Sequence, residues 1–191
     1  MRAKVVILVL SIVVGASVLW VDRSVAKMSP IQDDVTRVAN ALALGASHAD
    51  RDTLGKAART LDALGAHPAD DHDPDLARLW AAAAYRGKAA PPPFRGRILG
   101  PGYVAGAVAA GGRVATEQLF LGGQSAHVAV STATSAKLSL TIRNGNGDTV
   151  CAIPNNSANT ACHWVAIFSE RYRIEVSNPS AQSAKYFLVT N

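Results

Sequence analysis

Residues 67–75, HPADDHDPD, place two histidines and four aspartates within nine positions. Imidazole and carboxylate groups bind divalent cations and transfer protons, so this stretch has the residue types of a metal or acid–base site. His67 and His72 are five residues apart in a segment broken by proline, whereas the two histidines of a helical zinc motif are four apart. Carboxylates that precede a helix cap its free amides and suit its dipole. We therefore predict helix capping at 67–75 and keep a divalent-cation site as the alternative.

A second oxygen-rich stretch, NGNGD at 144–148, has some of the residue types of a calcium loop. A loop of the EF-hand type needs a bidentate glutamate at its twelfth position, and Asn155 stands there when the loop begins at Asn144. Asn and Gly next to each other also form tight hairpin turns, because both tolerate positive φ. We predict a hairpin turn at 144–148, with calcium binding as the alternative.

Nucleophilic catalysis has two candidate residue pairs. Ser125 and His127 lie in GGQSAH (122–127), which lacks the glycine that follows the serine of a nucleophile elbow, and no orienting carboxylate is evident beside them. Cys162 is followed by His163, but adjacent residues of a strand face opposite ways. We predict no catalytic residue, and an unrecognised secreted hydrolase is the alternative.

The motifs of other enzyme classes are also missing. The sequence contains no His-Glu-x-x-His zinc motif and no glycine-rich phosphate loop. Glycosidases need two carboxylates that face each other across a cleft. The region after residue 98 holds four acidic residues, of which Glu175 alternates onto the polar face of its strand. We therefore predict neither a cofactor nor a metal.

The amino end has the pattern of an export signal. Arg2 and Lys4 precede seventeen residues without a charge, Val5 to Val21, and Ser24-Val25-Ala26 offers a small-x-small cleavage site. We predict that residues 1–26 are a signal peptide or, if uncleaved, an amino-terminal membrane anchor. The protein is then periplasmic or secreted, and residues 5–21 are its membrane contact only if they are retained.

The charge pattern does not indicate nucleic-acid binding. The net charge is +5, but much of the excess lies in the leader and in residues 81–97, which hold four basic residues and no acidic one. A nucleic-acid-binding domain gathers its basic residues on one folded face, so we predict no nucleic-acid partner.

Cys151 and Cys162 are the two cysteines of the chain, with ten residues between them. In an oxidising compartment a pair at this spacing can close a loop between neighbouring strands. We predict a disulfide, and two buried free thiols are the alternative.

Residues 28–86 have the apolar spacing of a small helical segment. Ile31, Val35, Val38 and Leu42 lie on one helical face, and Gly45 is the predicted end of that helix. A second helix is predicted from Asp50 or Asp52 to Gly65, and a third from Asp73-Pro74-Asp75 to Gly87, with Asp73 as a capping residue. Residues 87–97, GKAAPPPFRGR, are then a basic, proline-rich linker.

From residue 98 the hydrophobic period changes to two. Residues 137–143 and 171–177 alternate apolar and polar side chains, and 126–131, 162–168 and 185–190 are further candidate strands, with weaker ones near 115–121 and 148–153. Short strands at this spacing predict an antiparallel β-sandwich over 98–191. The predicted fold class is α+β by chain: a leader helix, a small α-helical segment and an all-β, jelly-roll-like sandwich.

Four stretches follow the strand and turn order of a known family: EQLFLGGQSAHVAVST (117–132), AKLSLTIRNGNGDTVC (136–151), SERYRIEVSN (169–178) and AKYFLVTN (184–191). In this order the chain from about residue 100 to 191 resembles the bacterial pre-peptidase C-terminal domain, a β-sandwich of jelly-roll type. The resemblance implies a non-catalytic module of secreted proteins, with a role in substrate binding, folding or surface attachment. It does not extend to residues 28–97.

Aromatic residues of the strands are the candidate binding surface. Trp164, Tyr172 and Tyr186 would favour a carbohydrate-binding module if their rings were exposed on a concave face, and Trp164 could instead belong to the core. We predict an exported, non-catalytic cell-envelope or secreted protein with a binding or accessory sandwich module. Its expected partner is an envelope protein or polysaccharide, and a carbohydrate-binding module is the alternative.

Overall fold

The computed structural model describes residues 30–48, 50–89, 100–155 and 160–191, so the predicted leader and most of the proline-rich linker lie outside the described residues. The first part of the described chain forms α1 (Pro30–Ser47), α2 (Arg51–Ala63), the two-residue strand β1 (His67–Pro68) and α3 (Leu76–Ala84). Among the helices described, none is long and apolar enough to cross a membrane.

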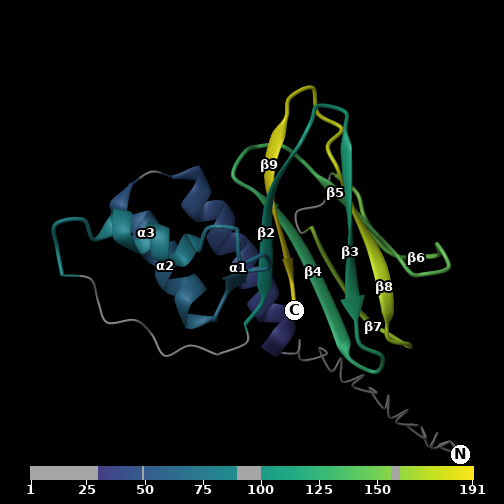
Figure 1. Ribbon diagram of the computed structural model, residues 1–191. Helices are drawn as coiled ribbons and strands as arrows, with labels where there is room; N and C mark the ends of the chain where they lie inside the picture. The colour runs from purple at the N-terminus through teal and green to yellow at the C-terminus, as the bar shows by residue number, and fades with distance from the viewer. Residues whose placement is uncertain (1–29, 49, 90–99, 156–159) are drawn as a thin grey trace, which may run out of the picture.

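Eight further strands form two sheets that lie face to face, and the helices lie beside one of them (Figure 1). Sheet A has the order β1-β2-β9-β4-β7 and sheet B the order β3-β8-β5-β6. All pairs are antiparallel except β1 with β2. Their bounds are β2 (Gly102–Val108), β3 (Arg113–Phe120), β4 (Ser125–Thr132), β5 (Ser139–Arg143), β6 (Thr149–Ile153), β7 (Ala161–Val165), β8 (Glu170–Ser177) and β9 (Ala184–Thr190).

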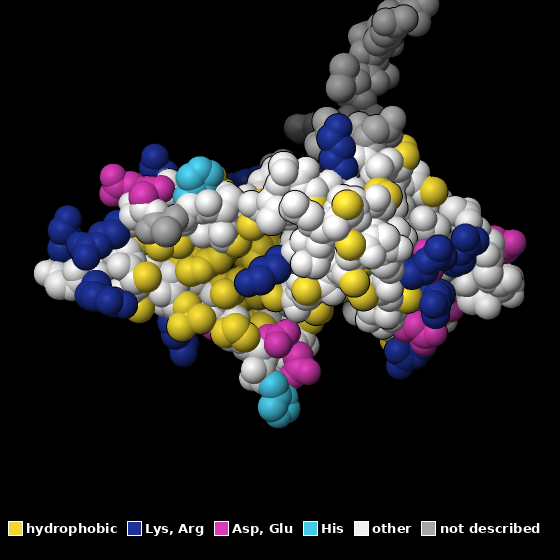
Figure 2. Space-filling model, turned by 90° about the horizontal axis from the view of Figure 1, so that it is seen from above, with side chains coloured by type: hydrophobic (Ala, Val, Ile, Leu, Met, Phe, Trp, Pro, Cys, Tyr) yellow, Lys and Arg dark blue, Asp and Glu magenta, His cyan; other side chains and the backbone are white. Residues whose placement is uncertain are grey.

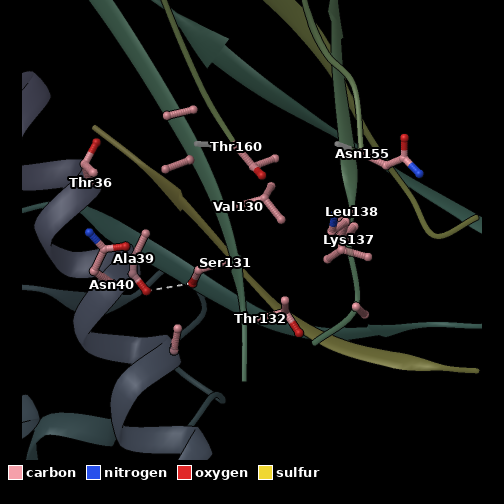
Figure 3. A pocket seen from close by; sticks show the side chains of 14 residues that line it. Thr36, Ala39, Asn40, Val130, Ser131, Thr132, Lys137, Leu138, Asn155 and Thr160 are labelled. Carbon is pink, nitrogen blue, oxygen red and sulfur yellow. Dashed lines mark hydrogen bonds between the residues drawn. The ribbon is translucent and has the colours of Figure 1, made fainter. Parts of the chain in front are cut away.

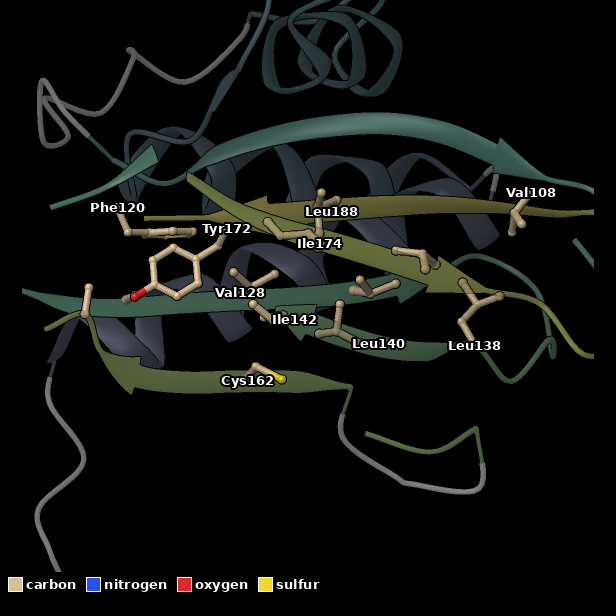
Figure 4. Close-up of a cluster of buried hydrophobic side chains, with 14 of the residues drawn as sticks. Val108, Phe120, Val128, Leu138, Leu140, Ile142, Cys162, Tyr172, Ile174 and Leu188 are labelled. Carbon is tan, nitrogen blue, oxygen red and sulfur yellow. The ribbon is translucent and has the colours of Figure 1, made fainter. Parts of the chain in front are cut away.

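The inward side chains of the two sheets form the core of the sandwich (Figure 4). Buried and less buried residues alternate along β5 and β8, as expected for strands with one face on a core and one toward water. Leu140 and Ile142 of sheet B pack in one cluster with Val128 and Leu188 of sheet A. The predicted α+β fold with a β-sandwich is therefore confirmed.

A second core lies between the helices and the outer face of sheet A. Val38 and Leu42 of α1 are fully buried and cluster with Tyr103, Phe187 and Val189 of the sheet. The middle of β4 is buried at five successive residues, because α1 covers one face of the sheet and sheet B covers the other. The helical segment and the sandwich thus share a hydrophobic core.

The capping carboxylates set where two helices begin. Asp50 caps α2, because its side chain accepts a hydrogen bond from the Thr53 amide at 2.9 Å. In the third helix Asp75, and not the predicted Asp73, is the capping residue, and it accepts from the Arg78 amide at 3.1 Å. Pro74 consequently precedes α3 instead of occupying its first turn.

Gly65 directly follows the C-cap of α2, Leu64, as predicted, while Gly87 lies two residues beyond the C-cap of α3, Tyr85. Gly65 and Gly87 have φ of 63° and 77°, the left-handed conformation that glycine adopts at low cost. The prediction for Gly45 is wrong, because α1 continues through it to Ser47. A Cβ there would lie 2.4 Å from the Trp80 ring, so close helix packing, and not helix termination, requires this glycine.

All seven strands predicted after residue 98 are present, within a few residues of their predicted bounds. β2 was not predicted, because its sequence, GYVAGAV, consists mainly of small residues and has no clear alternation. It nevertheless pairs with β9 along its whole length, from Gly102 with Thr190 to Val108 with Ala184.

The predicted disulfide is confirmed. Cys151 and Cys162 are joined, with their Cα atoms 6.0 Å apart. Cys151 belongs to β6, an edge strand of sheet B, and Cys162 to β7, an edge strand of sheet A. The bond therefore links the two sheets along one side of the sandwich.

Candidate functional site

The three candidate surface aromatics lie in or against the sandwich core, as the alternative for Trp164 had it and contrary to an exposed platform at Tyr172 and Tyr186. Tyr172 is only 3% exposed, because position 172 faces inward on β8. The half-buried Trp164 packs against both Phe120 and Tyr172, with ring centroids 5.0 and 5.2 Å away, and those two rings also contact each other at 5.7 Å. Burial raises the pKa of Tyr172. These rings fill space between the sheets and do not form an exposed platform.

Tyr186 is half-buried at the sheet and packs against the same core. Its cross-strand neighbour is Gly106, where a Cβ would lie 2.7 Å from the tyrosine ring. Burial raises the pKa of Tyr186 as well. The glycine makes room for the ring, which explains the partial burial of a residue predicted to be at a binding surface.

The acidic stretch 67–75 supplies local hydrogen bonds. The Asp70 carboxylate accepts from the His72 amide at 2.9 Å and lies 2.8 Å from His72 Nδ1, and these contacts lower the pKa of Asp70. Asp75 caps α3, and His67 pairs with Gly102 in β1. Within the described ranges no group of three or more His, Cys, Asp or Glu side chains is placed to hold a metal ion. The predicted capping role is thus carried by Asp75.

The stretch 144–148 is the predicted hairpin turn, and it joins β5 to β6. The Asn144 amide donates to the Asp148 carbonyl at 3.0 Å, and the Asn144 side-chain oxygen accepts from the amides of Asn146 and Asp148. Gly147 has φ of 86°, which a tight turn of this kind requires.

The structure removes the cysteine pair from the candidate nucleophiles and places Ser125 and His127 on β4. Both cysteine sulfurs belong to the disulfide, so neither is a thiol. His127 is buried in β4, and its ring centroid lies 6.2 Å from that of His163, its partner on β7. Ser125 pairs with Val165 at the start of β4.

A groove lies between α1 and the rim of the sandwich (Figure 3), and we call it the helix–sheet groove. Its volume is about 250 Å³. The Ser131 hydroxyl donates to the Ala39 carbonyl at 2.7 Å and so ties β4 to α1 within it. The lining residues are Thr36, Ala39, Asn40 and Ala43 of α1, Ala129–Thr132 of β4, and Ala136, Lys137, Leu138, Asn155, Thr160 and Ala161.

The helix–sheet groove is polar and carries one positive charge. Hydroxyl and amide groups line it, and Lys137 is the single charged side chain among the described lining residues. Such a set can donate hydrogen bonds to oxygen-rich groups and attract one negative group, but it holds no carboxylate for acid–base chemistry. No local sequence pattern indicates this site, because it forms only when α1 packs beside β4.

A second feature that the sequence analysis missed is an apolar patch where the β3–β4 and β7–β8 turns meet. We call it the loop-end patch, and it consists of exposed apolar side chains around this end of the sandwich: Leu121, Ile167 and Phe168 in the turns, with Leu119 on the outer face of sheet B and Val165 on the outer face of sheet A. Ile167 and Phe168 are 80% and 72% exposed. Apolar side chains also gather over the helical side of the molecule (Figure 2), where Leu44 and Leu79 are the large exposed ones.

No family model and no curated protein matches this chain. Solved structures are similar at low identity. They include a periplasmic inhibitor of g-type lysozyme from Aeromonas hydrophila (14% identity, TM-score 0.40, 48% of this chain and 84% of that one). A mitogen from Yersinia pseudotuberculosis has 11% identity and a TM-score of 0.41, over 49% and 86% of the two chains. The pre-peptidase C-terminal domain of a Bacillus anthracis collagenase has 10% identity and a TM-score of 0.41, over 47% and 87%. At these identities and TM-scores the likenesses do not place this chain in any of these families.

Proposed function

We propose that this chain is an exported, non-catalytic protein of the cell envelope whose helix–sheet groove binds a partner. The cystine supports export, because disulfides persist in oxidising compartments and are rare in the cytosol. The export-signal pattern of residues 1–26 agrees with it. The observation that carries binding is the groove itself, which gathers polar groups from α1, β4 and the segment before β5.

The lining indicates the chemistry of the ligand. Asn40 and the threonines of the groove offer hydrogen bonds, and Lys137 offers one positive charge without a carboxylate in the described lining to neutralise it. A polar ligand with one negative group fits this set. We propose that this group is a carboxylate, either of an envelope polysaccharide or of an acidic side chain of a partner protein.

Two alternatives are weaker. A carbohydrate-binding module of the aromatic-platform type needs exposed rings, whereas Tyr172 is buried and the half-buried Trp164 packs against Phe120 and Tyr172. A thiol hydrolase needs a free cysteine, whereas both cysteines are in the disulfide.

The test is affinity capture from envelope extracts with the exported form of the protein. Mass spectrometry and sugar analysis of the retained material separate a protein partner from a polysaccharide. Lys137→Glu reverses the charge in the groove and should abolish specific retention. Lys185→Glu is the matched control, because Lys185 is exposed but does not line the groove. Equal retention by both variants, or no specific companion of the wild type, would contradict the proposal.

A further inference from the structure

The loop-end patch concentrates the exposed apolar surface of the sandwich. Five of the nine large apolar side chains that are exposed in the described residues belong to it. Ile167 and Phe168, the two most exposed of the nine, are consecutive residues of the β7–β8 turn. Leaving such side chains in water is unfavourable, and a gathered set of them marks an interaction surface.

The two turns that carry the patch are held together by hydrogen bonds from backbone amides. The Gly122 amide donates to Ser169 Oγ at 2.9 Å, and the Gly123 amide to the Ala166 carbonyl at 2.7 Å. The Ala166 amide in turn donates to the Gln124 carbonyl at 3.2 Å. A Cβ at Gly122 would lie 3.0 Å from the Phe168 carbonyl carbon, so the glycine permits this close approach. The exposed side chains therefore stand on a fixed base.

Arginines lie next to these apolar side chains. Arg171 is paired with Leu119 across β3 and β8, and Arg173, two residues further on, is on the same face. The acidic neighbours are Glu117, opposite Arg173, and Glu170, whose carboxylate accepts from the Gly145 amide at 3.1 Å. Arg143 lies opposite Arg173 on β5, so the patch is an apolar tip with cationic side chains beside it that the two carboxylates offset in part.

The chain enters the fold at the same end of the molecule. In Figure 1 the first turn of α1 and the β3–β4 turn both lie at the lower end of the view. In the sequence, eight residues, 22–29, separate the apolar segment 5–21 from Pro30. Fully extended, eight residues reach about 28 Å. If segment 5–21 is retained in a bilayer, this tether keeps the end that carries the loop-end patch near the lipid surface.

We propose that the loop-end patch docks on a lipid bilayer, with Ile167 and Phe168 in the interface and Arg171 and Arg173 beside lipid phosphates. Apolar side chains at an interface enter the boundary between headgroups and acyl chains, while long cationic side chains extend to the phosphates. Because acidic neighbours offset the arginines, insertion of the two apolar side chains supplies most of the affinity. This contact is separate from residues 5–21 and from the helix–sheet groove.

The first experiment locates the patch in the bilayer. The full chain is labelled with an environment-sensitive fluorophore at Ile167→Cys or, as the matched control, at the exposed Leu79→Cys on α3, and incorporated into vesicles of phosphatidylcholine and phosphatidylglycerol. The label at position 167 should shift to shorter wavelength and be quenched by spin-labelled lipid, whereas the label at 79 should remain in water. An unshifted label at 167, or equal quenching at both positions, would overturn the proposal.

The second experiment measures the strength of docking. Three versions of the exported form are each sedimented with the vesicles of the first experiment. They are the wild type, the double variant Ile167→Ser with Phe168→Ser, and the control Leu79→Ser. The double variant should bind the vesicles at least about tenfold more weakly than the wild type, whereas the control should bind as tightly as the wild type. A further variant, Arg171→Gln with Arg173→Gln, should bind only a few-fold more weakly. Far-ultraviolet circular dichroism checks that each variant is folded. If the label at position 167 is shielded in the absence of vesicles, by a second copy of the chain or by a captured protein, then the loop-end patch binds protein and the lipid proposal is overturned.

Discussion

Truncation of Leu42 to alanine tests whether the helices and the sandwich form one cooperative structure. The Leu42 side chain is 0% exposed and belongs to the cluster that joins α1 to Tyr103, Phe187 and Val189 of sheet A. Leu-to-Ala changes in cores cost about 2–5 kcal/mol, and the cost rises with the cavity that remains. A hydrogen-bonded sheet forms one wall of this site and cannot collapse far, so we expect the upper half of that range.

The assay is urea unfolding followed by two probes. Tryptophan fluorescence reports Trp164 in the sandwich and Trp80 among the helices, while the far-ultraviolet signal reports the helices themselves. For Leu42→Ala both probes should show one shared transition, and its midpoint should lie at a lower urea concentration than that of the wild type, by an amount that corresponds to the whole loss of unfolding free energy. A loss below about 1 kcal/mol, or a helical transition that moves while the sandwich transition stays, would refute a shared core.

Three further predictions concern stability. Replacing Cys151 and Cys162 by serine opens a loop with a sequence separation of 11 and should cost about 3 kcal/mol in urea unfolding; an equal midpoint in the variant would contradict it. Tyr103→Phe removes the hydroxyl that accepts from the Leu76 amide at 2.8 Å and donates to the Pro74 carbonyl at 3.2 Å, which should cost about 1–2 kcal/mol and speed amide exchange at the start of α3. Burial raises the pKa of Tyr103 above its ordinary 10.0, so the folded state holds this proton more tightly than the unfolded one and stability should fall above pH 10, less so in Tyr103→Phe. Asn178→Ala removes an amide that donates to the carbonyls of Val108, Ala109 and Gln182, and thermal unfolding should show a loss of about 2–3 kcal/mol; a loss within error would show that water replaces the amide.

Local patterns predict the elements whose burial is one-sided. The alternation of apolar and polar residues in 171–177 predicts β8, because each inward side chain packs toward sheet A and each outward side chain is exposed to water. The Cys151–Cys162 disulfide and the Asn-Gly turn are predicted equally well, since each depends on residues that lie near each other in the sequence. The sequence pattern does not predict β2, because its small residues have no strong strand pattern and are held extended by pairing with β9.

The two candidate sites depend on contacts between distant segments. The helix–sheet groove exists because Ala39 and Ser131, far apart in the chain, are hydrogen-bonded, and no local pattern encodes that contact. The loop-end patch does leave a signal, because Leu121, Ile167 and Phe168 continue apolar character beyond the ends of β3 and β7. Apolar residues where a turn should be polar depart from the expected pattern, and such departures are expected at functional surfaces.

The position of α1 determines where this fold can bind anything. Since α1 lies on the outer face of sheet A, much of that sheet is buried on both sides and offers no broad open face. The aromatic residues that might form a flat platform are instead used between the sheets, where Phe120, Trp164 and Tyr172 pack together. Among the described residues, accessible surface includes the outer face of sheet B and the places where elements end, and both the helix–sheet groove and the loop-end patch are of the latter kind. Binding at such boundaries can change by substitution in turns and rims without disturbing either core.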